Sequence, residues 1–112
     1  MIERYLKTSD FSSTEEFAKG FHIDVPDNFN FAFDIVDGWA AEHPEKRALC
    51  WVNEHGLHHD FTFGEMKRLS DAAASFFQSI GIGRGDMVML MLKRRYEFWV
   101  AILGLHKIGA VA

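Results

Sequence analysis

The chain has 112 residues, of which 48% are hydrophobic and 25% are charged, a balance typical of one globular domain rather than of a disordered chain. Its formal net charge of −4, with no basic stripe, argues against nucleic acid as a partner. The single cysteine, Cys50, has no second cysteine to pair with, no apolar run typical of a signal peptide opens the chain, and the apolar run 98–105 is too short to span a bilayer. We therefore expect a cytoplasmic protein without a membrane span.

Residues 1–28 are predicted to form a peripheral N-terminal segment with one short helix. Ser13 and Glu16 have the spacing of a capping box, and Gly20 stands where that helix is expected to end. Pro26 marks a break in the pattern. We therefore expect a domain to begin at residue 29 and to continue to residue 112.

A second helix is predicted after residue 29, and Pro44 is expected to end it. Its hydrophobic residues recur at i, i+3, i+4, i+7 and i+8, which places them on one helical face: Ala32, Ile35, Val36, Trp39 and Ala40. Two β-like runs follow, at residues 48–52 and 57–63. The sequence NEHG separates them, which predicts a β-hairpin.

The next predicted helix begins directly after the hairpin. Thr62 and Glu65 form a second capping box, and Phe61 with Met66 has the spacing of a hydrophobic staple. One face of the helix is apolar until Gly81, and its members are Met66, Leu69, Ala73, Phe76, Phe77 and Ile80.

The C-terminal third of the chain has the pattern of a buried strand followed by a buried helix. Residues 87–92, MVMLML, do not alternate with polar residues, which predicts a strand covered on both faces as in a parallel sheet. A helix predicted over 95–108 is apolar around most of its circumference, which is typical of the interior of a larger structure. Such a unit normally leads to a second parallel strand, which has barely begun at Ala112. The predicted fold class is α/β, with helices, a β-hairpin and a truncated parallel β-α-β unit.

The glycine-rich stretch GIGRG at 81–85 has the composition of a phosphate-binding loop. Its spacing differs from GxGxxG, and it lies between a helix and a strand, whereas a dinucleotide fingerprint lies between a strand and a helix. A turn that requires positive φ values accounts for it better. The adhesion-type tripeptide at 84–86 is assigned to the same turn.

Three histidines cluster on the predicted hairpin, but strand alternation sends His58 and His59 to opposite faces, so we expect a polar hairpin surface rather than a zinc site. His106 is predicted to be a hydrogen-bonded interior histidine, and Cys50 to be an inert packing residue of its strand. The sequence gives no basis for a catalytic arrangement of a serine, a histidine and an acidic residue. The sequence therefore assigns no catalytic, cofactor-binding or metal-binding residue.

Three cations, Lys93, Arg94 and Arg95, stand between the predicted strand 87–92 and the helix after it. Ligands of open α/β sheets gather at the carboxyl ends of the strands, and helix N-termini attract anions, so these side chains are candidates to hold a phosphorylated ligand. The alternative is a solvated loop whose aliphatic stems cover the rim of an apolar core. Both interpretations stay open.

The order of motifs resembles the start of an AMP-forming acyl-CoA synthetase, a member of the adenylate-forming superfamily. The matching stretches are NFAFDIVDGWAAEHPEKRALCWV, then FTFGEM opening a helix, GIGRGDMV before the strand, and YEFWVAILGLHKIGAVA after it. The resemblance covers residues 29–112. It identifies this region as the start of the large N-terminal AMP-binding domain, truncated at its C-terminus. The superfamily usually has a Pro- or Asn-bearing loop where this chain has LKRRYEF, a departure that resembles prokaryotic acetate-type or medium-chain enzymes.

The resemblance implies an enzyme that uses ATP, magnesium and coenzyme A to activate a small carboxylic acid. The family's phosphate loop, acidic residues and lid lysine match no position in this chain, so the chain alone is expected to be inactive and to need the remainder of a parent chain. An apolar fragment of this kind is also expected to self-associate at its free sheet edge. The alternative is a free-standing small module, without enzymatic activity, that associates with itself or with a partner.

Overall fold

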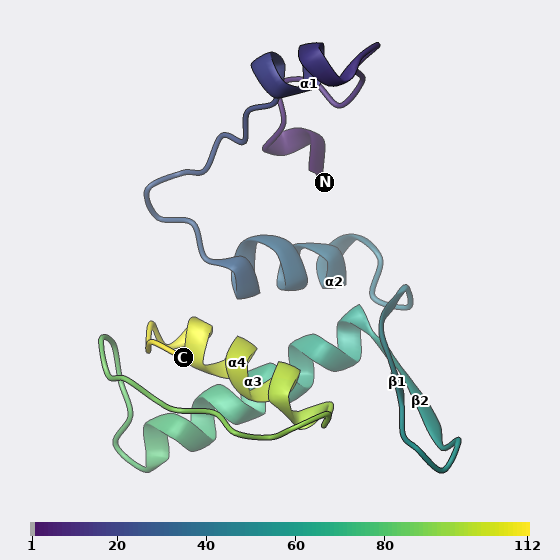
Figure 1. The fold of residues 1–112 in the computed structure, drawn as a ribbon. Helices are drawn as coiled ribbons and strands as arrows, with labels where there is room; N and C mark the ends of the chain where they lie inside the picture. The colour runs from purple at the N-terminus through teal and green to yellow at the C-terminus, as the bar shows by residue number, and fades with distance from the viewer. Residues whose placement is uncertain (1) are drawn as a thin grey trace.

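The computed structural model describes residues 2–112, which form helices, one two-stranded sheet and long connections (Figure 1). In chain order the elements are a 3₁₀ turn η1 (Ile2–Arg4), α1 (Thr14–Gly20), a π-helical segment η2 (Ala32–Asp37), α2 (Gly38–Glu42), β1 (Arg47–Val52), β2 (His58–Thr62), α3 (Phe63–Ser79) and α4 (Glu97–Lys107). Helices α3 and α4 pack against each other, η2 and α2 lie across them, and the hairpin extends from the start of α3 (Figure 1).

The N-terminal segment contains the predicted short helix. Ser13 caps α1 because its Oγ accepts a hydrogen bond from the Glu16 amide at 3.1 Å. The reciprocal half of the capping box is replaced, since the Glu16 carboxylate accepts from the amide and hydroxyl of Ser12 instead. In Figure 1 this segment stands apart from the other helices. The two ends of this N-terminal segment are linked by a backbone hydrogen bond, in which the Asp24 amide donates to the Tyr5 carbonyl at 2.8 Å.

The second predicted helix is present, but its first half is wound as a π-helix rather than an α-helix. Asn30 closes its N-terminus: the side-chain oxygen accepts from the Ala32 amide at 3.0 Å, and the Asn30 amide donates to the Asp34 carboxylate at 2.7 Å. The predicted apolar face is the buried one, with Ala32, Val36 and Ala40 all buried.

The hairpin and the start of α3 agree with the sequence pattern. Strands β1 and β2 are antiparallel, with an irregularity between Arg47 and Leu49. The capping box at Thr62 is complete, since its Oγ accepts from the Glu65 amide at 3.2 Å and the Glu65 carboxylate accepts from the Thr62 amide at 2.9 Å. Phe61 and Met66, the predicted staple, are both buried in the main core, which consists of Ala32, Val36, Phe61, Met66 and Leu103.

The apolar face predicted for α3 is only partly buried. Met66 is buried, but Phe76 and Ile80 are each 58% exposed, and the fully buried residue of this helix is Ser70. Small residues line the side of α3 that contacts α4, because α4 approaches closely. A Cβ built on Gly104 would lie 2.8 Å from the Cβ of Ala73. The two helices therefore meet through Ser70, Ala73, Ala74 and Gly104 rather than through the large apolar residues at the end of α3.

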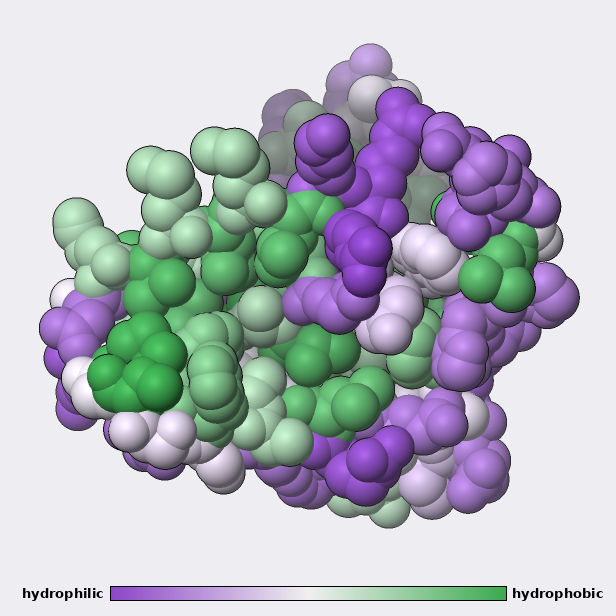
Figure 2. All heavy atoms as spheres, turned by 90° about the horizontal axis from the view of Figure 1, so that it is seen from below, coloured by the Kyte–Doolittle hydropathy of each residue, from purple (hydrophilic) through white to green (hydrophobic). Residues whose placement is uncertain are grey.

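The predicted buried strand at 87–92 is not observed, and this expectation is wrong. The segment is extended, but Met87, Met89 and Met91 are 79%, 86% and 83% exposed, while the residues between them are half-buried. A strand is buried on both faces only where other elements cover both, and among residues 2–112 only one face of this segment is covered. Figure 2 shows the result as a broad hydrophobic area on the face seen from below.

A parallel β-α-β connection is nevertheless started. Residues 87 and 111 form an isolated parallel bridge, in which the Val88 amide donates to the Val111 carbonyl and the Val111 amide donates to the Asp86 carbonyl, both at 2.8 Å. Helix α4 is the crossover between these two stretches. In residues 2–112 no helix is both long enough and apolar enough to cross a bilayer.

Candidate functional site

The cationic loop at 93–95 is attached to the β-hairpin by one tryptophan. The indole Nε1–H of Trp51 donates to the Arg94 carbonyl at 2.8 Å. The next residue of the chain, Tyr96, packs edge-on against Trp51 and tilted against Phe61, with ring centroids 5.5 and 4.9 Å apart. Lys93 has a φ of 46°, which is uncommon for a residue other than glycine. The loop is therefore held in one conformation by contacts with β1 and β2.

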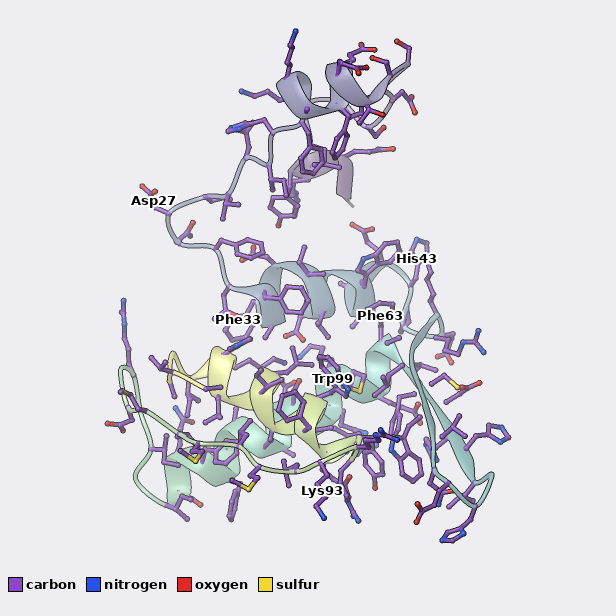
Figure 3. The ribbon with its side chains drawn as sticks, in the orientation of Figure 1. Asp27, Phe33, His43, Phe63, Lys93 and Trp99 are labelled. Atoms are coloured by element: carbon purple, nitrogen blue, oxygen red, sulfur yellow. The ribbon has the colours of Figure 1, made fainter. Side chains whose placement is uncertain are left out.

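The three cations differ in their partners. The Arg95 guanidinium binds the Glu97 carboxylate with a shortest distance of 2.6 Å, and this hydrogen bond raises the pKa of Arg95 and lowers that of Glu97. Lys93 and Arg94 form no ion pair within residues 2–112. Lys93 lies on the opposite side of the α3 and α4 pair from Phe33 (Figure 3). Two unpaired positive charges thus stand beside an open depression formed by β1, the loop and the first turn of α4.

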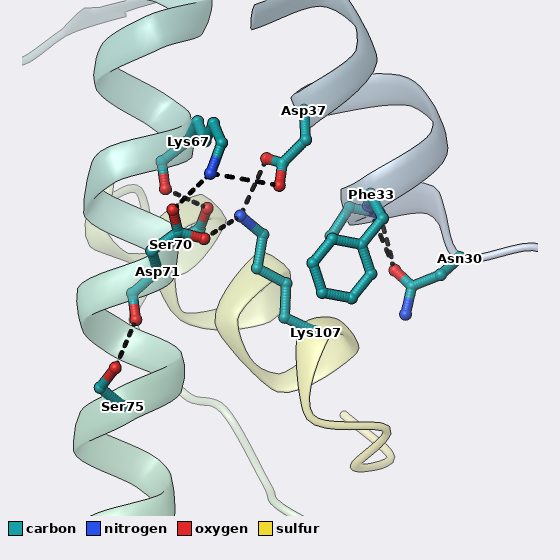
Figure 4. A network of polar contacts seen from close by, with 9 residues as sticks. Asn30, Phe33, Asp37, Lys67, Ser70, Asp71, Ser75 and Lys107 are labelled. Carbon is teal, nitrogen blue, oxygen red and sulfur yellow. Dashed lines mark hydrogen bonds and ion pairs between the residues drawn. The ribbon is translucent and has the colours of Figure 1, made fainter. Parts of the chain in front are cut away.

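A second group of charges, which the sequence analysis did not identify, lies where three helices meet (Figure 4). The Lys107 ammonium, in a side chain only 3% exposed, lies 2.8 Å from the Asp37 carboxylate and 2.5 Å from that of Asp71. Lys67 completes the group at 2.6 Å from Asp71. Burial works to raise the pKa of Asp71, but the hydrogen bonds from Lys107 and Lys67 prevail and lower it.

This group of charges is a structural feature rather than a reactive one. Every charge in it has an opposite charge in contact, so none is left free for a ligand. The ammonium of Lys107 also faces the ring of Phe33 at 5.5 Å. The sequence signal for the group was a lysine at the end of an otherwise apolar helix, together with a lysine and an aspartate four residues apart in α3.

The other sequence candidates do not come together into a site. Gly81 and Gly85 have φ values of 90° and 87°, as expected for a turn in the GIGRG stretch. The carboxylate of Asp86 closes this turn by accepting from the Gly83 amide at 2.8 Å. Among the described residues no group of three or more histidine, cysteine, aspartate or glutamate side chains is placed to hold a metal ion.

Two single-residue predictions are corrected by the structure. Cys50 is exposed instead of packed in the core, because it lies on the outer face of β1 opposite Asp60. The hydrogen bond to the Asp60 carboxylate raises the pKa of the thiol, which disfavours the nucleophilic thiolate. His106 is not fully satisfied, since its buried Nδ1 has no hydrogen-bond partner among residues 2–112.

Comparison with known proteins identifies the family. Residues 36–112 match the family model described as "AMP-binding enzyme", and the chain belongs to this family. The human protein named acyl-coenzyme A synthetase ACSM3, mitochondrial, is 33% identical over 107 residues, which are 90% of this chain and 18% of that protein. The human protein named acyl-coenzyme A synthetase ACSM2B, mitochondrial, is 41% identical over 96 residues, which are 80% and 17% of the two chains.

Solved structures give the same result. A Brucella canis acyl-CoA synthetase matches with a TM-score of 0.68 and 27% identity, covering 73% of this chain and 15% of that one. The acetoacetyl-CoA synthetase from Streptomyces lividans matches with a TM-score of 0.71 and 25% identity, covering 82% and 14%. The α/β fold expected from the sequence is thus confirmed as that of an adenylate-forming enzyme's N-terminal subdomain. The chain spans less than a fifth of the length of the two human relatives described above.

Proposed function

We propose that this chain is the N-terminal part of an AMP-forming acyl-CoA synthetase. The supporting observation is the match of residues 36–112 to the AMP-binding enzyme family together with relatives that are named acyl-coenzyme A synthetases. In the proposed reaction a carboxylate oxygen attacks the α-phosphorus of ATP, and pyrophosphate leaves. The thiol of coenzyme A then attacks the acyl carbon, loses its proton, and releases AMP.

The 112 residues are proposed to be inactive by themselves. ATP and magnesium require phosphate-binding backbone and clustered oxygen ligands. The described residues contain no cluster fit for a metal, and the glycine-rich turn precedes an extended segment instead of a helix. The side chains present do not fit these cofactors, so we assign no chemical step to them. In this proposal the remainder of a parent chain supplies the reacting site.

The loop 93–95 is proposed to contact an anionic group of the ligand, with the phosphates of coenzyme A as the candidate. Lys93 and Arg94 have no acidic partner in the described residues, and Trp51 holds the loop that carries them. The departure of this loop from the usual Pro- or Asn-bearing form is the basis for proposing an acetate-type or medium-chain acid as substrate. The cytoplasmic location predicted from the sequence belongs to the same proposal.

The test begins with the gene beyond the codon for Ala112. If the reading frame continues, the longer protein should form AMP only when ATP, an acid and coenzyme A are all present, and a panel of acetate and medium-chain acids should identify the preferred one. The 112-residue chain assayed in parallel should be silent. A stop codon after Ala112, or a longer protein inactive with every acid, would contradict the enzyme proposal and favour the free-standing module.

The role of the loop is tested in that longer enzyme. The double substitution Lys93→Ala and Arg94→Ala should raise the KM for coenzyme A and leave the KM for ATP unchanged. Arg95→Ala is the matched control, since Arg95 is already neutralised by Glu97 and should have a smaller effect. If neither the double variant nor the triple alanine variant changes the KM for coenzyme A, the loop has no role in binding it.

A further inference from the structure

The helix formed by η2 and α2 is buried through every fourth residue. Ala32, Val36 and Ala40 are 0%, 7% and 7% exposed, and the residues between them are half-buried or exposed. An α-helix turns by about 100° per residue, so residues four apart drift by about 40°, and Ala32 and Ala40 would lie about 80° apart. A π-helix, whose hydrogen bonds reach the fifth residue, turns less per residue. Winding the first half as a π-helix therefore keeps the three residues in one row facing the α3 and α4 pair.

The π-helical half is anchored to α4 at both ends (Figure 4). At its start the side-chain amide of Asn30 donates to the His106 carbonyl at 2.7 Å. At its end the Asp37 carboxylate lies 2.8 Å from the Lys107 ammonium. The two partners are consecutive residues of α4. The chain between Asn30 and Asp37 therefore has to fit between two fixed points.

The hydrogen bonds show that one residue more than an α-helix would use lies between these anchors. The Gly38 amide donates to the carbonyls of Phe33 and Ile35, five and three residues back. An α-helix would use the carbonyl four residues back, that of Asp34. A turn closed over five residues takes up one additional residue, and such turns are rare in proteins. The turn therefore stores one residue that an α-helical turn would release.

An α-helical register of the same chain has to be reached by slippage on the N-terminal side of the turn. On the C-terminal side Trp39 stacks on Phe63 with ring centroids 5.6 Å apart, which holds α2 against the start of α3. On the N-terminal side residues 24–30 contain no helix or strand, so they are able to shift by one position. Conversion of the π-helical turn into an α-helical turn therefore draws the preceding residues forward by one position.

The side chains of the slipped register explain why the chain does not adopt it. Phe33 would take the place of Ala32, which is 0% exposed, and a phenyl ring there would overpack the contact with α3 and α4. Phe31 would take the place of Asn30, and a phenyl ring cannot donate to the His106 carbonyl. Two features thus hold the π-helical turn, namely the hydrogen bond of Asn30 and the size of Phe33.

We propose that η2 is a two-register element, in which Asn30 and Phe33 hold the π-helical turn against an α-helical register one residue shorter. The ion pair of Asp37 with Lys107 is common to both registers, because the slip moves the residues at and before the start of the turn. The attachment of the N-terminal segment differs, since residues 2–31 are drawn toward the helix by one position. The winding of η2 and the position of the N-terminal segment are therefore coupled.

The first experiment removes the stored residue from the full-length product of the gene. Deletion of Phe33 should leave the residues before it on their present partners, and a crystal structure should show the Gly38 amide bound to the Asp34 carbonyl. The thermal midpoint should stay within about 5 °C of that of the unchanged protein. Deletion of Ala72 is the matched control, because this exposed residue lies in the regular helix α3, where its loss rotates one part of the helix by about 100° against the other. The control deletion should lower the midpoint much further.

The second experiment releases both restraints in the same full-length protein. Asn30→Ala combined with Phe33→Ala removes the anchor and lets a small side chain enter the buried place at the start of η2. The turn should then rewind, and a crystal structure should show the α-helical hydrogen bond described for the deletion. Asn30→Ala combined with Phe31→Ala is the matched control, because Phe31 and Phe33 are both 49% exposed and only Phe33 blocks the slip. The control and each single variant should keep the π-helical turn.

Three results would each overturn the proposal. The first is an unchanged full-length protein in which the Gly38 amide binds the Asp34 carbonyl. The second is an equal loss of thermal midpoint in the two deletion variants. The third is a variant Asn30→Ala with Phe33→Ala that keeps the π-helical turn or does not fold. Hydrogen-bond register and thermal midpoint do not depend on enzymatic activity, so these outcomes are independent of the function proposed above.

Discussion

The ammonium of Lys107 lies 2.8 Å from the carboxylate of Asp37, although 70 positions separate the two residues. The Asp71 carboxylate of α3 forms an ion pair with the same ammonium, so one buried cation joins η2, α3 and α4 (Figure 4). Two further polar contacts join these parts of the chain: the Lys67 ammonium lies 3.7 Å from the Asp37 carboxylate, and the Asn30 side-chain amide donates to the His106 carbonyl at 2.7 Å.

Replacing Lys107 should lower the free energy of unfolding. Lys107→Met keeps most of the side-chain volume but leaves Asp37 facing Asp71 with only the half-exposed Lys67 between them, so the free energy of unfolding should fall by about 2–4 kcal/mol. Lys67→Met, at a side chain 45% exposed, should cost less than about 1 kcal/mol. Urea unfolding followed by circular dichroism measures both values. Equal losses in the two variants would show that Lys107 does not have the central role.

The same group predicts an acid-sensitive component of stability. The pKa of Asp71 is lowered in the folded chain below its ordinary value of 3.8, because the hydrogen bonds from Lys107 and Lys67 outweigh the effect of burial. A lowered folded-state pKa gives stability that is fully present above the unfolded-state pKa and is lost as the pH falls through the folded-state value. The free energy of unfolding should therefore decline below about pH 4. In Asp71→Asn this decline should be smaller, and parallel curves for the two proteins would contradict the assignment.

Local sequence signals predicted the elements whose causes are local. The capping residues Ser13 and Thr62 stand where α1 and α3 begin, and the NEHG turn joins β1 to β2. These features depend on residues a few positions apart, which the sequence displays directly. The resemblance to acyl-CoA synthetases was also visible in the order of short motifs, and the family match confirms it.

Features that depend on residues distant in the sequence were either not predicted or predicted wrongly. The exposure of Met87, Met89 and Met91 follows from what covers the segment, and an apolar run alone does not encode its own neighbours. Likewise the partners of Lys107 lie 36 and 70 positions away, and only the packing of the helices brings them together. Of the small α3 residues that contact α4, Ala73 is on the predicted face but Ser70 and Ala74 are not, whereas Phe76 and Ile80 of the predicted face are exposed.

Close approach of those two helices gives a prediction for Gly104. A Cβ at this position would lie 2.8 Å from the Ala73 Cβ and 3.0 Å from the Ala74 amide nitrogen, so Gly104→Ala forces α3 and α4 apart. The helical preference of alanine over glycine returns about 1 kcal/mol, and overpacking costs more, for a net loss of about 1–2 kcal/mol. Adding Ala73→Gly should restore part of this loss. Urea unfolding of the single and double variants measures both effects. If Gly104→Ala proved as stable as the unchanged chain, the close contact would be contradicted.

The attachment of the cationic loop predicts a local effect of Trp51. Trp51→Phe keeps an aromatic ring against Tyr96 but removes the indole N–H that binds the Arg94 carbonyl. The backbone order parameters of residues 93–95 should then fall, while those of α3 should change little. Trp39→Phe is the matched control, because Trp39 stacks on Phe63 at the start of α3 and, within residues 2–112, forms no hydrogen bond with the loop. Because Lys93 has a positive φ, release of its neighbour lets the loop relax to ordinary backbone angles, so the two cations lose their fixed position. Unchanged order parameters at 93–95 in Trp51→Phe would mean that the contacts of Tyr96 hold the loop without this hydrogen bond.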